Sequence, residues 1–284
     1  MRIGVTGATG FIGTHLLSAL KGRGAVVTLE RKKGVPSRQN LKRFVADTDI
    51  IFHLGGVNRD TDEEILSGNI LSTSRLLESI LNHGKPSARI VFASSSQIYI
   101  LKNRKTPIRE TGKAKPDTVY GVSKLSAENL IINSGIPSVI LRVANVYGPG
   151  CRPNYNSVIA TLCYRAIMNK PLVINGDGKQ CRDFVYIDDV VRAFMLAGFK
   201  PVTGSGNIFN VSSGRLVSLR QIVKQIGKLN KNTKVEFVKD QESSGISYSC
   251  DSSKFSAKYG WRPRVSLSKG IEQTLSYFLG RKKI

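Results

Sequence analysis

A tyrosine and a lysine four residues apart are well suited to move a proton. In the segment Y-G-V-S-K at 120–124, a helix would place Tyr120 and Lys124 one turn apart on the same face. A phenol titrates near pH ~10, so it is a poor base at neutral pH unless a cation such as Lys124 stabilises the phenolate. A hydroxyl from the serines at 94–96 would share the substrate's proton. The pattern predicts acid–base chemistry on a substrate hydroxyl.

A glycine-rich turn near the start of the chain predicts a dinucleotide site. The sequence T-G-A-T-G-F-I-G at 6–13 follows an apolar strand and opens an amphipathic helix. Gly7 permits the tight turn, Gly10 lets a pyrophosphate approach the backbone, and Gly13 lets the helix and strand pack closely. Free N–H groups at the helix start attract phosphate. A purely structural turn is the alternative, but the strand–turn–helix context favours dinucleotide binding.

The end of the second strand leaves the choice of dinucleotide open. Glu30 is placed to accept from the adenosine ribose and would repel a 2′-phosphate, which favours NAD. Arg31, with Lys32 and Lys33, would instead accept that phosphate, which favours NADP. A solvated charged turn is the alternative for the two lysines. We expect NAD, with NADP as the second choice.

The elements that must position these residues alternate between strands and helices. Apolar, β-branched runs predict strands at 3–5, 26–30, 50–54, 90–93 and 139–142, and helical spacing predicts helices at 11–20, 63–81 and 120–132. This alternation predicts an α/β fold with a Rossmann-type doubly wound parallel sheet. The carboxyl edge of such a sheet would gather the glycine turn, the serines and Tyr120 in one crevice.

A second part of the chain is expected after Pro149. Its elements are shorter, with helices predicted at 158–168, 188–197, 219–228 and 267–279. We therefore predict a dinucleotide-binding domain at 1–149, which carries the catalytic residues, and a smaller α/β substrate-binding lobe at 150–284. One segment of that lobe, at 203–210, is a candidate to return to the sheet. The stretch 30–49 is short for a full strand, helix and strand, so one peripheral element is expected to be missing.

The charge balance points to anionic ligands. A formal net charge of +23 fits dinucleotide and nucleotide phosphates, nucleic acid or acidic lipid. The alternative is solvated surface charge, because most lysines are scattered along the chain. The two basic clusters, 31–33 and 281–283, are not interleaved with aromatic residues as single-strand binding would require.

Cysteine usage and hydropathy exclude several classes of protein. The four cysteines lie far apart with no C-x-x-C pair, so we expect free thiols, no disulfide framework and no metal site. No apolar stretch approaches the ~20 residues of a membrane span, and no signal peptide is visible. The chain is therefore expected to be cytoplasmic.

These motifs together resemble the extended short-chain dehydrogenase/reductase family, which includes the NAD-dependent nucleotide-sugar epimerases, dehydratases and reductases. The matching segments cover nearly the whole chain: 6–13, F-H-L-G-G at 52–56, Asn69, F-A-S-S-S-Q-I-Y at 92–99, 120–124, L-R-V-A-N-V-Y-G-P at 141–149, G-D-G-K-Q-C-R-D-F-V-Y-I-D-D-V at 176–190 and Y-G-W-R-P at 259–263. The resemblance implies an NAD(P) domain, a C-terminal lobe that holds a nucleoside diphosphate sugar, and a homodimer formed by helices of the first domain.

The resemblance also implies the roles of individual residues. The catalytic hydroxyl, 25 residues before the tyrosine, falls on Ser95, beside Tyr120 and Lys124. The implied cofactor-binding residues are Gly7, Thr9, Gly10, Phe11, Ile12, Gly13, Glu30, Arg31, Leu54, Gly55, Asn69, Tyr120 and Lys124. The implied substrate-binding residues are Ser95, Ser96, Asn145 and Arg182. Asn145 could instead cap a turn, and Arg182 could instead pair with Asp183.

Two departures from the family pattern bear on the reaction. Ser96 and Gln97 stand where the family's 4,6-dehydratases place an Asp-Glu pair that moves protons during water loss, which disfavours a dehydratase. Gln241 stands near the place of a second arginine that binds the diphosphate, which weakens the case for a standard UDP-hexose.

Three functions are therefore kept open. The first is a nucleotide-sugar 4-epimerase that oxidises C4 transiently with retained NAD. The second is a nucleotide-ketosugar C4 reductase that consumes NADPH. A distant alternative, motivated by the charge, is a nucleic-acid or membrane-surface binding protein on a dehydrogenase scaffold. Retention of Ser95, Tyr120 and Lys124 favours an enzyme, with nucleic acid as a disfavoured partner.

Overall fold

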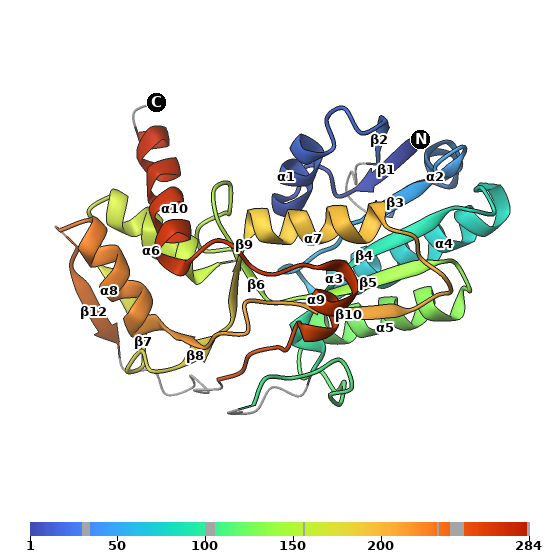
Figure 1. Ribbon diagram of the computed structural model, residues 1–284. Coiled ribbons are helices and arrows are strands. Elements are labelled where there is room, and N and C mark those ends of the chain that lie inside the picture. The colour runs from blue at the N-terminus through green and yellow to red at the C-terminus, as the bar shows by residue number, and fades with distance from the viewer. Residues whose placement is uncertain (30–34, 100–105, 156, 232, 239–246, 283–284) are drawn as a thin grey trace.

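A six-stranded parallel sheet forms the centre of the protein (Figure 1). The computed structural model describes residues 1–29, 35–99, 106–155, 157–231, 233–238 and 247–282. The strands lie in the order β10 (Asn207–Val211), β5 (Ser138–Val143), β4 (Arg89–Ser95), β3 (Ile50–His53), β1 (Arg2–Thr6) and β2 (Ala25–Leu29), each parallel to its neighbour. The predicted Rossmann-type α/β class is confirmed.

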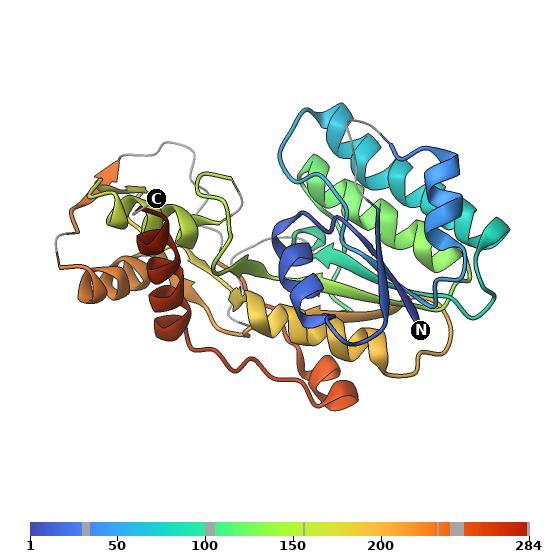
Figure 2. The same cartoon turned by 90° about the horizontal axis from the view of Figure 1, so that it is seen from above.

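Helices cover both faces of this sheet, as Figure 2 shows from above. On one face lie α2 (Arg38–Val45), α4 (Ser72–His83) and α5 (Val119–Asn133), and on the other α1 (Phe11–Ala19) and α7 (Ile187–Phe199). Every residue of β3 and of β5 is buried. Burial on both faces explains why these strands read as continuous apolar runs rather than alternating ones.

The strand order creates a crevice at the edge where the parallel strands end. From β1 the chain passes outward to β2 and then returns past β1 to β3, so the direction of winding reverses between β1 and β3. Ligands of open α/β sheets bind outside the carboxyl ends of the strands at such a reversal. Within the described residues β2 is the edge strand of the sheet and α2 is the next element along the chain.

The helix predicted at 63–81 is interrupted. The chain forms α3 (Asp62–Leu66), a π-helical turn at Ser67–Leu71 and then α4. The prediction of a single regular helix was therefore wrong, although its extent was right. A π turn adds a residue to one turn, and it buries Gly68 and Asn69 toward the crevice.

The elements after residue 150 divide between two places. α7 packs on the sheet, β10 adds its last strand, and α9 (Ser253–Tyr259) packs against β10. The others form a second group, with α6 (Val158–Ile167), α8 (Leu219–Leu229) and α10 (Leu267–Lys282) beside short strand pairs (Figure 1). The pairs are β7 (Leu172–Asn175) with β12 (Val235–Val238), β8 (Cys181–Arg182) with β11 (Val217–Ser218), and β6 (Asn145–Tyr147) with β9 (Phe184–Tyr186), and the last pair joins the two groups. None of the helices in the described ranges is long and apolar enough to span a membrane.

Candidate active site

Helix α5 delivers Tyr120 to the end of β4. Thr118 caps the helix by accepting a hydrogen bond from the Gly121 N–H at 3.1 Å. Gly121 allows the helix start to approach the neighbouring backbone, because an added Cβ would lie 2.6 Å from the Gln97 carbonyl oxygen. This close approach places the Tyr120 hydroxyl in hydrogen bond with Ser95, the serine to which the resemblance assigns the catalytic hydroxyl.

Burial shifts the pKa values of Tyr120 and Lys124 on α5. Burial raises the pKa of Tyr120 to about 12, and the hydrogen bond with Ser95 acts in the opposite direction. Burial lowers the pKa of Lys124 to about 8, so the lysine stays largely protonated at neutral pH. Its Nζ donates to the Ala93 carbonyl at 2.9 Å and lies 5.9 Å from the centre of the Tyr120 ring. Lys124 therefore places a positive charge beside Tyr120, where it would stabilise the phenolate.

The glycine turn fits the phosphates of a dinucleotide. Gly7 adopts φ of +66°, and its position would bring an added Cβ within 2.7 Å of the Gly55 backbone. Gly10 N–H closes the turn onto the Gly7 carbonyl at 3.0 Å. The start of α1 that follows has no side-chain cap, so its N–H groups point into the crevice for an anion.

A test of this turn is the Gly13→Ala variant. An added Cβ at Gly13 would lie 2.1 Å from the Gly7 carbonyl oxygen and 2.8 Å from that of Ala8, and neither backbone atom can swing away. We expect dinucleotide affinity to fall at least about tenfold, because the turn must open, and this corresponds to about 1.4 kcal/mol. Calorimetric titration of the cofactor-free protein with NAD measures it. Gly227→Ala in α8, where nothing lies within 4 Å, is the control and should bind as wild type does.

A chain of hydrogen bonds fixes the floor of the crevice. The Gly55 N–H donates to Thr6 Oγ1 at 3.0 Å, and Thr6 lies 2.7 Å from His53 Nδ1. His53 Nε2 lies 2.9 Å from Thr73 Oγ1, whose own proton goes to the Asn69 carbonyl. Burial, helped by the charge of Lys124, lowers the pKa of His53 to about 3. A neutral ring protonated at Nε2 satisfies every link.

Asn69 lies beneath the crevice and binds the backbone of the loop after β3. Its amide accepts from the Val57 N–H at 2.7 Å and donates to the Val57 carbonyl and to Ser123 Oγ, both at 2.8 Å. Gly56 leaves no room for a side chain, since an added Cβ would lie 2.7 Å from Asn69 Oδ1. The π turn thus holds the loop after β3, and the predicted contribution of Asn69 to cofactor binding would act through Val57.

Two cavities meet at Tyr120. The larger, of about 720 Å³, is lined by the glycine turn and the predicted catalytic side chains, and the smaller measures about 580 Å³. From the predicted set the larger cavity takes Gly7, Thr9, Gly10, Phe11, Ile12, Gly13, Leu54, Ser95, Ser96, Tyr120, Lys124 and Asn145. Gly55 lies just beneath, bonded to Thr6. Glu30 and Arg31, and with them the prediction about the ribose, lie outside the described residues.

The predicted substrate residues divide between the two cavities, because Ser95 and Ser96 line only the larger one. Asn145 lines both cavities, and its amide donates to the Asp183 carbonyl at 2.9 Å. Arg182 lines the smaller one. Asp183 is buried and accepts hydrogen bonds from the backbones of Ser213, Gly214 and Cys250.

Sequence reasoning missed several residues of these walls. Asn58 and Gln97 line both cavities, Arg59 lines the smaller, and Arg152, Tyr155, Tyr277 and Arg281 line the far wall of the larger. The sequence carried a signal for Gln97, as a neighbour of the serine cluster, and for Arg281, as a member of the basic tail. No group of His, Cys, Asp or Glu in the described part of the chain could hold a metal ion.

Comparison with known proteins identifies the relatives of this chain. The model of the NAD dependent epimerase/dehydratase family matches residues 3–212. A UDP-2-acetamido-2,6-beta-L-arabino-hexul-4-ose reductase of Pseudomonas aeruginosa is 38% identical over 202 residues, which are 69% of this chain. The chain spans about half of that relative, covering 49% of its length.

Two further relatives match over the full length. A protein of Bacillus subtilis named as an uncharacterised UDP-glucose epimerase is 30% identical and covers 98% of each chain. The crystal structure of UDP-glucuronic acid 4-epimerase from Bacillus cereus, in complex with UDP-glucuronic acid and NAD, superposes with a TM-score of 0.87. Its sequence is 29% identical, and the match covers 99% of this chain and 100% of that one.

Proposed function

Because this chain belongs to the NAD-dependent epimerase/dehydratase family, we propose that it is a nucleotide-sugar 4-epimerase that works with NAD. The observation that carries the proposal is the Ser95–Tyr120–Lys124 group at the junction of the two cavities. A glycine turn fitted to phosphates lines the larger cavity on one side of that junction. The smaller one on the other side is lined by polar side chains, by the cations Arg59 and Arg182 and by the carboxylates Asp60 and Asp62.

The residues of this group divide the proton chemistry among them. Tyr120 takes the proton from the C4 hydroxyl of the sugar, and Ser95 bonds that hydroxyl and the tyrosine together. Lys124 stabilises the phenolate form of Tyr120, which is the form able to take that proton. Bound NAD would supply the acceptor for the hydride of C4 and the source of its return. Epimerisation then requires the oxidised sugar to rotate in the site, so that the hydride returns to the other face of C4. Tyr120 then gives its proton back to the oxygen at C4.

The smaller cavity supplies cations for the substrate's diphosphate. Arg59 and Arg182 both line it, and a guanidinium can bind a phosphate through two parallel N–H donors. Gln241, the departure at the family's second arginine, lies outside the described residues. We assign its role to Arg59, which comes from the segment after β3.

A C4 ketosugar reductase is the second candidate. The 38% identity with the Pseudomonas aeruginosa reductase favours it, over two thirds of this chain. The same three residues would serve, with Tyr120 giving a proton to the ketone oxygen. A dehydratase is favoured least, because Ser96 and Gln97 carry no proton acceptor comparable to a carboxylate.

One experiment separates the two candidates. The protein is purified without added cofactor and denatured, and any released nucleotide is identified by absorbance and mass. We expect about one equivalent of NAD per chain, since an epimerase recycles its cofactor. A protein that emerges empty and then oxidises NADPH with a 4-ketosugar nucleotide would replace the epimerase with the reductase.

We also propose a homodimer through the helices of the first domain. Leu66 on α3, Leu71 on the π turn and Val122 on α5 are exposed large apolar side chains. These three elements contact one another, so the side chains belong to one region of the surface. Exposed apolar side chains gathered in this way suit a protein interface.

A further inference from the structure

Glu128 is a buried carboxylate that the proposed mechanism does not use. It lies on α5 one turn beyond Lys124, and its side chain is 1% exposed. Arg142 on β5 binds it with two nitrogens, Nε at 3.0 Å and Nη2 at 2.7 Å. Burying an ion pair costs several kcal/mol of desolvation per ion, so a pair kept here calls for a role besides stability.

The position of Glu128 makes it one of three contacts between α5 and the end of β4. The last three residues of β4 contact three residues of the helix that are spaced one turn apart. The Ala93 carbonyl accepts from Lys124, the Ser94 hydroxyl donates to Glu128, and the Ser95 hydroxyl bonds Tyr120. The contact of Ser94 with Glu128 therefore fixes the end of β4. This strand end presents a carbonyl to Lys124 and a hydroxyl to Tyr120.

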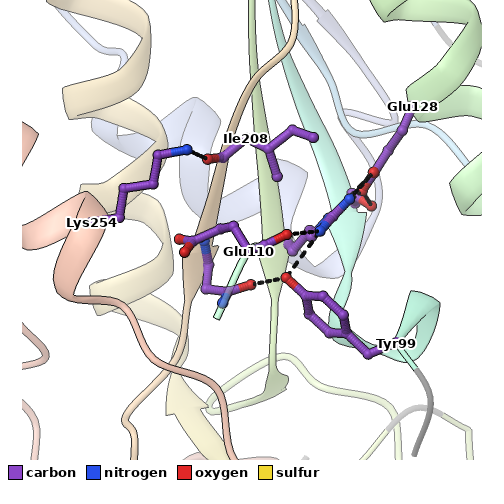
Figure 3. A network of polar contacts seen from close by, with 8 residues as sticks. Tyr99, Glu110, Glu128, Ile208 and Lys254 are labelled. Atoms are coloured by element: carbon purple, nitrogen blue, oxygen red, sulfur yellow. Dashed lines mark hydrogen bonds and ion pairs between the residues drawn. The ribbon is translucent and has the colours of Figure 1, made fainter. Parts of the chain in front are cut away.

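Arg142 fixes Glu128 in turn, within the network drawn in Figure 3. The other end of its guanidinium donates to the Tyr99 hydroxyl at 3.0 Å and to the Glu110 carbonyl at 3.2 Å. Tyr99 donates to Asn210 Oδ1 at 2.7 Å, and the Asn210 N–H donates to Glu110 Oε1 at 2.8 Å. The network anchors Glu128 to β5, to β10 and to the segment around 110, so the carboxylate has little freedom to move.

The charges around Lys124 leave Glu128 as its nearby anion. His53 faces the lysine from β3 and stays neutral, because burial lowers its pKa to about 3. Tyr120 on α5 is a neutral phenol before reaction. The positive charge of Arg142 is matched by Glu128 itself. The negative charge of Glu128 raises the pKa of Lys124 against the lowering effect of burial.

We propose that Glu128 is a positioning residue for the catalytic group: held by Arg142, it fixes Ser94 so that Ser95 meets Tyr120, and it keeps Lys124 a cation. The first half of this role is geometric and the second is electrostatic. Both halves rest on the proposed function for their effect on turnover, but the electrostatic half is measurable without any substrate.

Ser94→Ala tests the geometric half, because it removes one contact and leaves the ion pair intact. We expect kcat to fall about tenfold with KM and melting temperature nearly unchanged, since the strand end loses its hold on the helix. Ser79→Ala is the matched control. Ser79 Oγ is buried and has no hydrogen-bond partner among the described residues, so this variant should keep wild-type kcat. A wild-type kcat in Ser94→Ala would overturn the geometric role.

Glu128→Gln tests the electrostatic half by nuclear magnetic resonance of protein labelled with ¹³C at the lysine Cε, with Lys124 assigned from the Lys124→Met spectrum. We expect the titration midpoint of Lys124 to fall by about one pH unit, the size of effect expected from a neighbouring opposite charge. Glu78→Gln, which removes an exposed carboxylate on α4, should leave it unchanged. An unchanged midpoint in Glu128→Gln would overturn the electrostatic role.

Two further measurements keep the test decisive. If Glu128→Gln does not fold because Arg142 is left unpaired, Glu128→Asp replaces it: the charge stays and the reach shortens. We then expect a wild-type Lys124 midpoint with the kcat loss of Ser94→Ala, and a wild-type kcat would count against the proposal. If wild-type protein turns over no nucleotide sugar, the proposed function fails, whereas the Lys124 titration still decides the role of Glu128.

Discussion

Replacing Tyr120 with phenylalanine is expected to lower kcat by about 10³-fold while the protein still binds its cofactor, since positioned acid–base groups contribute about 10²- to 10⁴-fold. The change removes only the hydroxyl that bonds Ser95 at the junction of the two cavities. The ring, which lies 5.9 Å from Lys124 Nζ, is kept, so packing should not change. Single-turnover kinetics with the nucleotide sugar, together with NAD titration, measure both effects.

The matched control for this loss is Tyr164→Phe. Tyr164 is half-buried on α6 and packs edge-on against Phe278, with ring centres 5.6 Å apart, outside both cavities. This variant should keep wild-type kcat. If Tyr120→Phe also turns over at the wild-type rate, Tyr120 is not the group that moves the proton, and the assignment of the whole catalytic group fails.

Replacing Lys124 with methionine is expected to lower kcat at neutral pH by about 10²-fold and to move the acidic limb of the pH–rate profile upward by about 1 to 3 pH units. The sign follows from the charge. A nearby cation favours the phenolate, so its removal raises the pKa of Tyr120, which burial already places at about 12. The phenolate is then available only at higher pH, and raising the pH should restore part of the lost rate.

A surface lysine separates this local effect from loss of charge alone. Lys224→Met in α8 removes an exposed cation that lines neither cavity, so its pH profile should match wild type. The Lys124 variant has a second signature that needs no substrate. The charge of Lys124 helps burial to lower the pKa of His53 to about 3. That pKa should therefore rise when the lysine is lost. A profile identical to wild type would exclude the lysine from the chemistry.

Local patterns in the sequence determined much of the fold. Continuous apolar runs marked β1, β3, β4 and β5 because strands covered on both faces carry little else. Tight turns and cap positions marked the glycine turn and the start of α5, since these depend on residues near in sequence. The same patterns missed α2 and α9, whose short apolar stripes are set by the surfaces they pack against.

The candidate site shows the same division more sharply. Residue type and spacing alone pointed to Tyr120, Lys124 and the glycines, because a helical turn and a phosphate turn are local geometries. Which serine meets the tyrosine came from a resemblance, and the hydrogen bond between Ser95 and Tyr120 depends on the register of α5 against β4. Arg59 and Arg281 line the cavities only because distant segments fold to the same crevice.

The sequence by itself thus determined the class of fold and pointed to the residues of the candidate site, because backbone conformation and the reactivity of side chains are largely local properties. Only the tertiary structure decided how that chemistry is held. It broke the helix at 63–81 into a π turn that carries Asn69, and it buried Glu128 between Ser94 and Arg142. Both arrangements depend on contacts between residues far apart in the chain, and such contacts leave no periodic signal in the sequence.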